Sequence, residues 1–118
     1  MSHKINTAVI GVGKLGSSHA RVYGELAQAN LVGVCDIEKS RALSVAESYQ
    51  TQAFSDYKDL FDKVEAVSIA TPTISHYQIA KDFLLAGINV LVEKPFTTTL
   101  KEADSLLKIA GKKKLLVQ

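Results

Sequence analysis

The sequence predicts an α/β fold: a doubly wound parallel sheet of about six strands with helices on both faces. Short runs of apolar, largely β-branched residues recur along the chain, and they lack the polar alternation of strands that face water on one side. Segments with apolar residues at helical spacing separate these runs. Apolar strands that alternate with helices are typical of a parallel sheet covered on both sides.

The strands are expected where the apolar runs meet turn residues. The first run, residues 5–10, ends at Gly11, and the second ends at Asp36. The fourth run stops at Thr71 and Pro72, because a residue before proline favours extended backbone and proline starts a turn. In chain order, the predicted strands span residues 5–10, 31–35, 52–54, 66–70, 88–92 and 115–117.

Helices are expected between these strands, and three residues predict where the later helices begin and end. Ser75 is a candidate N-cap, Gly87 a candidate C-terminal cap, and Thr99 a candidate N-cap of the last helix. Gly24 is a weak but tolerable point in the first helix. In chain order, the predicted helical segments span residues 14–28, 40–49, 56–61, 75–87 and 99–110.

The composition excludes several classes of partner. The chain has 118 residues, enough for one domain, and its 14 Lys and Arg against 12 Asp and Glu leave a net charge of +2. That charge is too small to indicate nucleic acid or an anionic membrane surface, and the basic run at residues 112–114 suits a solvated turn. No stretch approaches the ~20 apolar residues that span a bilayer, and no signal-peptide core follows Met1. We therefore expect a cytoplasmic protein that binds neither nucleic acid nor membrane.

The cysteine and the histidines predict no metal site. Cys35 is the single cysteine, and within an apolar run it is expected to be a small buried side chain. His19 is expected to pack or cap within the first helix rather than to act directly. The histidines show no ligand spacing and are His3, His19 and His76.

A glycine-rich turn follows the first strand and opens directly into a helix. The turn reads Gly11-Val12-Gly13-Lys14-Leu15-Gly16, a G-x-G-x-x-G run. Its first glycine permits the tight turn, the second lets a pyrophosphate approach the backbone, and the third lets helix and strand pack closely. The helix start adds free N–H groups and a partial positive charge. This context predicts a dinucleotide-binding Rossmann fold, with residues Gly11, Gly13, Lys14, Leu15 and Gly16 at the phosphates.

Asp36 supports the same interpretation. It lies 20 residues after Gly16, at the end of the second strand, where an acid can accept hydrogen bonds from an adenosine ribose. Its carboxylate would repel the 2′-phosphate of NADP. Lys39 and Arg41 follow closely enough to weaken this distinction, so NAD is the expected cofactor and NADP the less favoured one.

Two other nucleotide sites were weighed. The run is not a P-loop, because Ser17 follows Gly16 where Lys-Ser or Lys-Thr is required. A methyltransferase that binds S-adenosylmethionine also uses a glycine-rich first turn and an acid after the second strand, so the first half of the chain leaves that alternative open.

The second half of the chain carries two further motifs at strand ends. Thr71-Pro72-Thr73-Ile74-Ser75-His76 follows the fourth strand, and Glu93-Lys94-Pro95 follows the fifth. With these motifs the sequence resembles the glucose-fructose oxidoreductase and inositol dehydrogenase family (Gfo/Idh/MocA). The N-terminal domains of that family carry a G-x-G-x-x-G, an acid after strand two, a T-P-x-x-x-H and an E-K-P, and this chain has all four in order.

The resemblance implies a role for each residue of these motifs. It implies that Thr71 and Pro72 pass along the pyrophosphate and the nicotinamide ribose. His76 lies just behind them, either in contact with the cofactor or simply at the helix start. Glu93 is implied to hold the ribose or neighbouring backbone, and Lys94 to sit beside the nicotinamide. The resemblance also implies a cis bond before the proline that follows Lys94.

Chemistry gives Lys94 a role of its own as the candidate catalytic residue. Removal of a hydride from an alcohol requires the hydroxyl proton to leave, and a nearby ammonium stabilises the developing alkoxide and orients the oxygen. The alternative is a surface ion pair with Glu93. A methyltransferase has no use for a lysine at this place.

In the family that the sequence resembles, the proton-transferring residues lie in a second domain that follows this one. The resemblance therefore implies a C-terminal substrate and oligomerisation domain beyond residue 118. It also implies that residues 1–118 alone bind the cofactor without turnover. The expected function is the cofactor domain of an NAD-dependent oxidoreductase that acts on a ring hydroxyl of a sugar, nucleotide sugar or cyclitol, as a homo-oligomer. A methyltransferase domain and a non-catalytic dinucleotide sensor or interaction module remain as alternatives.

Overall fold

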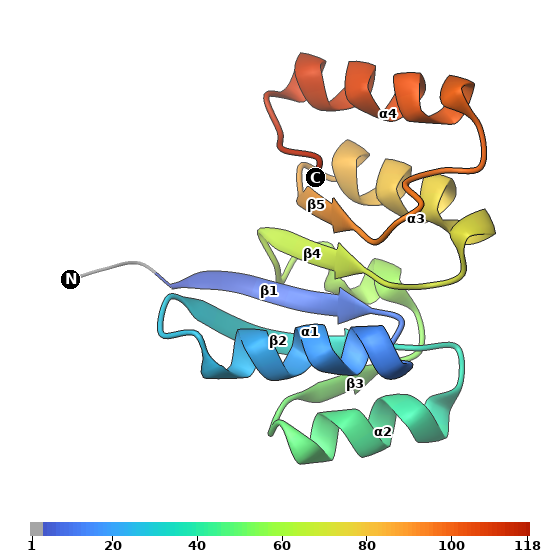
Figure 1. Ribbon diagram of the computed structural model, residues 1–118. Coiled ribbons are helices and arrows are strands. Elements are labelled where there is room, and N and C mark those ends of the chain that lie inside the picture. Colours follow the sequence, from blue (N-terminus) through green and yellow to red (C-terminus); the bar gives the residue numbers. More distant parts are fainter. Residues whose placement is uncertain (1–3) are drawn as a thin grey trace.

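The computed structural model describes residues 4–118 and contains a parallel sheet of five strands in the order β3-β2-β1-β4-β5 (Figure 1). This confirms the predicted doubly wound α/β fold. The strands are β1 (Ile5–Ile10), β2 (Ala29–Cys35), β3 (Gln52–Phe54), β4 (Ala66–Ile69) and β5 (Asn89–Val92). The helical elements are α1 (Lys14–Glu25), α2 (Lys39–Ser48), the 3₁₀ helix η1 (Tyr57–Leu60), α3 (Thr73–Leu85) and α4 (Leu100–Lys113).

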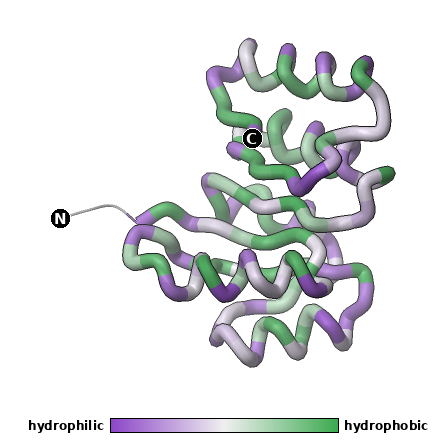
Figure 2. The backbone as a smooth tube through the Cα atoms, viewed as in Figure 1, coloured by the Kyte–Doolittle hydropathy of each residue, from purple (hydrophilic) through white to green (hydrophobic). Residues whose placement is uncertain are grey.

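The sheet separates two hydrophobic cores, because successive side chains of a strand point to opposite faces. In β1, Val9 packs beneath α1 and α2, whereas Ala8 and Ile10 pack on the opposite face with η1, α3 and α4. The second core is the larger and includes Phe83 and Leu106, both fully buried. Figure 2 shows that hydrophobic residues recur along the central strands and along the helices that cover the sheet.

The strand order reverses between β1 and β4, and this reversal places the site. The chain runs outward from β1 through β2 to β3, then crosses to the other side of β1 to form β4 and β5. The ends of β1 and β4 lie side by side, with Ile10 paired to Ile69. In open parallel sheets, ligands bind beyond the carboxyl ends of the strands at such a reversal.

The predicted sixth strand is reduced to a single bridge. Val117 pairs in parallel with Val90, and the backbone N–H of Val92 donates to the carbonyl of Gln118 at 2.7 Å. This last segment adds only an isolated bridge at the free edge of β5, so among residues 4–118 the sheet has five strands and not six. His3, one of the three histidines weighed in the sequence, lies outside the residues that the structure describes.

The helix ends agree with the prediction at two caps and differ at one. Thr99 accepts a hydrogen bond from the backbone N–H of Glu102 and caps α4, and Gly87, at φ +85°, follows the end of α3. Ser75 is not an N-cap. Pro72 takes that position, since its fixed φ suits a helix start, and the Ser75 hydroxyl donates back to the Pro72 carbonyl from within the first turn.

Smaller differences concern the bounds of the elements. Helix α1 ends at Glu25 and not near residue 28, because Leu26 is extended, and β2 begins earlier than predicted, at Ala29. Helix α4 continues to Lys113, where Lys114 in a left-handed conformation ends it. No helix among residues 4–118 has the length and apolar character needed to cross a membrane.

Candidate cofactor-binding site

The glycine-rich turn is built as the sequence predicts. Gly11 has a φ of +87°, and a Cβ there would lie 2.9 Å from the Ala70 carbonyl carbon. A Cβ on Gly16 would lie 1.7 Å from the carbonyl oxygen of Gly11, so only glycine lets α1 start this close to the turn. At Gly13, by contrast, a Cβ would meet only the Arg41 guanidinium, at 4.0 Å. The backbone at Gly13 is therefore open to an incoming group.

The start of α1 offers backbone donors to an anion. Its N-cap, Gly13, has no side chain, so no capping bond satisfies the first-turn N–H groups. The Ser17 hydroxyl donates to the Val12 carbonyl at 3.0 Å and holds the turn in place. Lys14 and Leu15 are exposed and Gly16 is buried beneath the turn. These three residues can meet a phosphate through their backbone, which fits a pyrophosphate at the helix start.

Asp36 is buried, with 7% of its surface exposed, and both carboxylate oxygens accept backbone hydrogen bonds. Oδ2 accepts from the Val12 amide at 3.0 Å, and Oδ1 accepts from the Glu38 amide at 2.9 Å. The first bond joins the end of β2 to the glycine-rich turn. Asp36 thus supports the turn as well as facing the site, a second role that the sequence did not indicate.

Arg41 stands over the same carboxylate from the first turn of α2. Its Nη1 lies 3.6 Å from Asp36 Oδ2, and its Nη2 lies 2.8 Å from Glu38 Oε2. The guanidinium is about half exposed, so its positive charge is held at the mouth of the site by two carboxylates. Arg41 is one of the two residues, with Lys39, that weaken the sequence-based choice between NAD and NADP, and its guanidinium lies against the Asp36 carboxylate.

One cavity of about 370 Å³ lies at the carboxyl ends of the strands and brings together five of the eleven predicted site residues. Gly11, Gly13, Asp36, Thr71 and Pro72 line it together. The other six do not line it and are Lys14, Leu15, Gly16, His76, Glu93 and Lys94. The cavity also has lining residues that sequence reasoning missed, namely Ile37, Ser55, Tyr57, Ile74 and Ser75. Ile37 and the Ile74–Ser75 pair adjoin the motifs, so their neighbourhood could have indicated them, whereas no local signal marks Tyr57.

His76 is not open to a ligand. It is 1% exposed, and both ring nitrogens face backbone carbonyls: Nδ1 lies 3.0 Å from the oxygen of Pro95, and Nε2 lies 2.8 Å from that of Thr71. The His76 ring therefore connects the loop after β4 to the loop after β5. Of the two alternatives left open for this residue, direct contact with a cofactor does not fit these contacts.

Glu93 and Lys94 lie after β5 and do not pair with each other. Glu93 Oε1 instead lies 2.7 Å from Nε2 of His19, in the second turn of α1. Lys94 is exposed and has no ion pair with any residue in the described range 4–118. The Lys94–Pro95 bond is cis, as the resemblance implied. The alternative of a Glu93–Lys94 surface ion pair is thus wrong for this structure, and His19 makes a contact that the sequence did not reveal.

Two ionisable side chains of the cavity are unsuited to acid–base work at neutral pH. Burial raises the pKa of the Cys35 thiol to about 12, with the Asp36, Asp56 and Asp59 carboxylates adding to the effect. Burial also raises the pKa of the Tyr57 hydroxyl, and its hydrogen bond to Asp82 raises it further. Both groups stay protonated at neutral pH and can serve only to shape the cavity.

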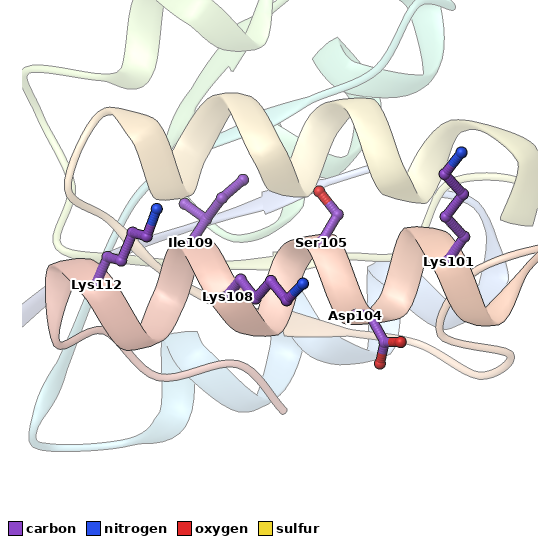
Figure 3. A pocket seen from close by; sticks show the side chains of 6 residues that line it. All are labelled: Lys101, Asp104, Ser105, Lys108, Ile109 and Lys112. Atoms are coloured by element: carbon purple, nitrogen blue, oxygen red, sulfur yellow. The ribbon is translucent and has the colours of Figure 1, made fainter.

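A larger depression of about 590 Å³ runs along α4, away from these motifs (Figure 3). Ser105 and Ile109 point from it toward α3, and Asp104 points away. Its lining side chains all belong to this one helix and are Lys101, Asp104, Ser105, Lys108, Ile109 and Lys112. One helix face with solvated charges offers no convergent donors, so we assign it no function. Residues 4–118 contain no cluster of metal-ligating side chains.

Comparison with known proteins decides the family. The model of the family described as "Oxidoreductase family, NAD-binding Rossmann fold" (GFO_IDH_MocA) matches residues 5–118. The chain belongs to this family. The resemblance drawn from the four motifs is confirmed, and the chain is an NAD-binding Rossmann domain.

Relatives of known activity are dehydrogenases of sugars and cyclitols. The UDP-N-acetylglucosamine 3-dehydrogenase of Acidithiobacillus ferrooxidans is 42% identical over 113 residues, covering 96% of this chain and 36% of that protein. An inositol 2-dehydrogenase of Rubrobacter xylanophilus is 36% identical over 111 residues, covering 92% of this chain and 31% of that protein. The chain spans about a third of the length of these relatives.

Solved structures agree on the fold. The UDP-N-acetylglucosamine 3-dehydrogenase from Acidithiobacillus ferrooxidans superposes with a TM-score of 0.91 at 41% identity, over 99% of this chain and 38% of that one. GenD2 from gentamicin A biosynthesis, solved in complex with NAD, gives a TM-score of 0.96 at 28% identity, over 99% of this chain and 34% of that one.

The contacts of His76 lead to a stability prediction. Changing His76→Ala removes a fully buried ring and its contacts with the carbonyls of Thr71 and Pro95, so we expect the free energy of unfolding to fall by about 2–4 kcal/mol. Gln78→Ala, at an exposed position of the same helix, should change it by less than about 0.5 kcal/mol. Urea unfolding followed by circular dichroism measures the free energy of unfolding of the two variants. Equal losses in the two variants would contradict the role of His76 in connecting the two loops.

Proposed function

We propose that the chain binds NAD across the carboxyl edge of the sheet, with the pyrophosphate at the start of α1, the adenosine ribose at Asp36 and the nicotinamide beside Lys94. The observation that carries the proposal is the open backbone at Gly13. It lies over an uncapped helix start and lines the same cavity as the buried carboxylate of Asp36. An anion and a ribose diol are the two groups that these features suit.

The adenine is expected between two isoleucines at the mouth of the cavity. Ile37 is 97% exposed and Ile74 is 84% exposed, and both line the cavity from opposite motifs. Apolar side chains so exposed at the edges of one cavity suit the flat faces of an adenine ring. The Tyr57 ring, held by the hydrogen bond of its hydroxyl to Asp82, also lines this cavity.

Lys94 is the candidate catalytic residue of this proposal. When bound, the cofactor supplies an acceptor for the hydrogen and electron pair that leave an alcohol carbon. The exposed ammonium of Lys94 stabilises negative charge on the alcohol oxygen as its proton departs. The base that takes that proton is expected outside residues 1–118. His76 and Thr71 act as positioning residues, because they hold the loop on which Lys94 lies to the loop after β4.

The whole protein is proposed to be an NAD-dependent dehydrogenase that oxidises a ring hydroxyl of a sugar, nucleotide sugar or cyclitol. The activities in the names of the relatives support this substrate class. A C-terminal domain would supply the base, the substrate specificity and the contacts of a homo-oligomer. We further propose that the protein has no nucleic-acid or membrane partner, because the net charge is only +2, and that it lies in the cytoplasm, as expected from the sequence. The membership of an oxidoreductase family and the presence of Lys94 argue against a methyltransferase.

Calorimetric titration of the chain with NAD, NADP and S-adenosylmethionine tests this function. We expect NAD to bind, NADP to bind at least about tenfold more weakly because of Asp36, and S-adenosylmethionine not to bind. Binding of S-adenosylmethionine alone would contradict the proposal. A non-catalytic sensor would bind NAD equally well, so turnover by a longer form of the protein separates the two functions. A dehydrogenase turns over and loses that activity in Lys94→Ala, whereas a sensor shows no turnover to lose.

A further inference from the structure

The segment that carries Lys94 is held at two points by Glu93. The Glu93 backbone N–H donates to the carbonyl of Ile69 at 3.0 Å, which continues the pairing of β5 with β4. The Glu93 carboxylate lies 2.7 Å from His19 Nε2, with the two side chains 30% and 18% exposed. The second contact joins the loop after β5 to α1.

His19 lies on the helix whose first turn faces the pyrophosphate. The contact therefore connects the phosphate end of the site to the segment at the nicotinamide end. Without His19, the nearest unpaired cation along the chain for Glu93 is the adjacent Lys94, which has no ion pair of its own among the described residues. An ion pair between these neighbours would occupy the ammonium that the chemistry requires.

We propose that His19 is a positioning residue for Lys94: by holding the Glu93 carboxylate against α1, it keeps that carboxylate from neutralising the ammonium. The inference rests on the proposed function, which places the nicotinamide beside Lys94. It differs from a purely structural role, in which His19 would only fix α1 to the sheet. The two roles predict different effects on the two redox forms of the cofactor.

The charge of the nicotinamide makes the difference measurable. The oxidised ring is positively charged and the reduced ring is neutral, so a free ammonium nearby disfavours NAD⁺ relative to NADH. Once Glu93 pairs with Lys94, this preference weakens. ADP-ribose lacks the nicotinamide and should be insensitive to the change.

The experiment measures the Kd of the chain for NAD⁺, NADH and ADP-ribose by calorimetry. For His19→Ala we expect the ratio of the NAD⁺ Kd to the NADH Kd to fall by roughly threefold to tenfold, toward the value of Lys94→Ala, with ADP-ribose binding unchanged. His19→Gln keeps an N–H donor and should preserve the ratio. The double variant His19→Ala/Glu93→Gln should restore it, because no carboxylate is left to pair with Lys94.

Two results would overturn the inference while the proposed function stands: an unchanged ratio in His19→Ala, or a parallel loss of NAD⁺, NADH and ADP-ribose binding. If the wild-type chain binds neither nucleotide, the proposed function itself fails. His19→Asn, polar but too short to reach Glu93, repeats the test if His19→Ala does not fold, as judged by circular dichroism. It is expected to lower the ratio in the same way.

Discussion

Asp36→Ala is expected to weaken NAD binding about a hundredfold. The variant loses the buried carboxylate that we propose accepts from the ribose diol, and hydrogen bonds to a charged group contribute about 1.5–3 kcal/mol each. It also removes the acceptor of the Val12 amide, so the glycine-rich turn loses a support. Calorimetric titration with NAD measures the loss. Asp36→Asn serves as the matched variant, since its amide oxygen can still accept from Val12 while the charge is gone.

The same variant is expected to bind NADP more tightly than the wild-type chain does. With Asp36 removed, the guanidinium of Arg41 loses one of its two carboxylate partners and becomes available to a 2′-phosphate. We expect a gain of about tenfold in NADP affinity. The double variant Asp36→Ala/Arg41→Ala should lose this gain. A gain that persists without Arg41 would contradict the assignment of the guanidinium.

Gly16→Ala is expected to have the largest effect on folding. The added Cβ would lie 1.7 Å from the Gly11 carbonyl oxygen, a backbone atom that cannot move without displacing α1 or the turn. We expect a loss of about 3 kcal/mol or more in the free energy of unfolding, and a fall in Tm of roughly 10 °C or more. NAD binding should disappear with the turn.

Two other glycines provide matched controls for this prediction. A Cβ at Gly24, near the end of α1, or at Gly111, within α4, would meet nothing within 4 Å. Gly24→Ala and Gly111→Ala should therefore stabilise the chain by about 0.5–1 kcal/mol, because alanine suits a helix better than glycine. Thermal unfolding compares the three variants. Equal behaviour of Gly16→Ala and Gly24→Ala would contradict the close approach of α1 to the turn.

The sequence predicted the fold well because its signals are local. Apolar runs marked β1, β2, β4 and β5, and Gly87 and Thr99 marked helix ends through backbone geometry and capping chemistry that involve near neighbours. It failed where the outcome depended on competition between adjacent residues. The Ser75 hydroxyl could cap a helix, but the helix already begins after Pro72. The Ser75 hydroxyl therefore lies within the first turn and donates to the Pro72 carbonyl.

The site was predictable where one motif acts by itself. The roles of Gly11 and Gly16 could be assigned from spacing because each acts through backbone close to it in the fold, whereas no spacing indicated the bond from the Val12 amide to Asp36. The partners of histidines were not predictable, since they come from distant segments. His19 meets Glu93 from 74 positions away, and His76 reaches the loop after β5. Such pairs follow from the strand order of the sheet, which periodicity along the chain does not encode.

The most direct test of the whole account is a crystal structure of the chain with NADH bound. The account predicts the pyrophosphate against the backbone of Gly13 to Gly16, the adenosine ribose hydroxyls within hydrogen-bond distance of Asp36, and the nicotinamide ring next to the Lys94 ammonium. A dinucleotide bound in the reverse direction, with its nicotinamide at Asp36, would contradict the account, as would one bound away from the carboxyl edge of the sheet.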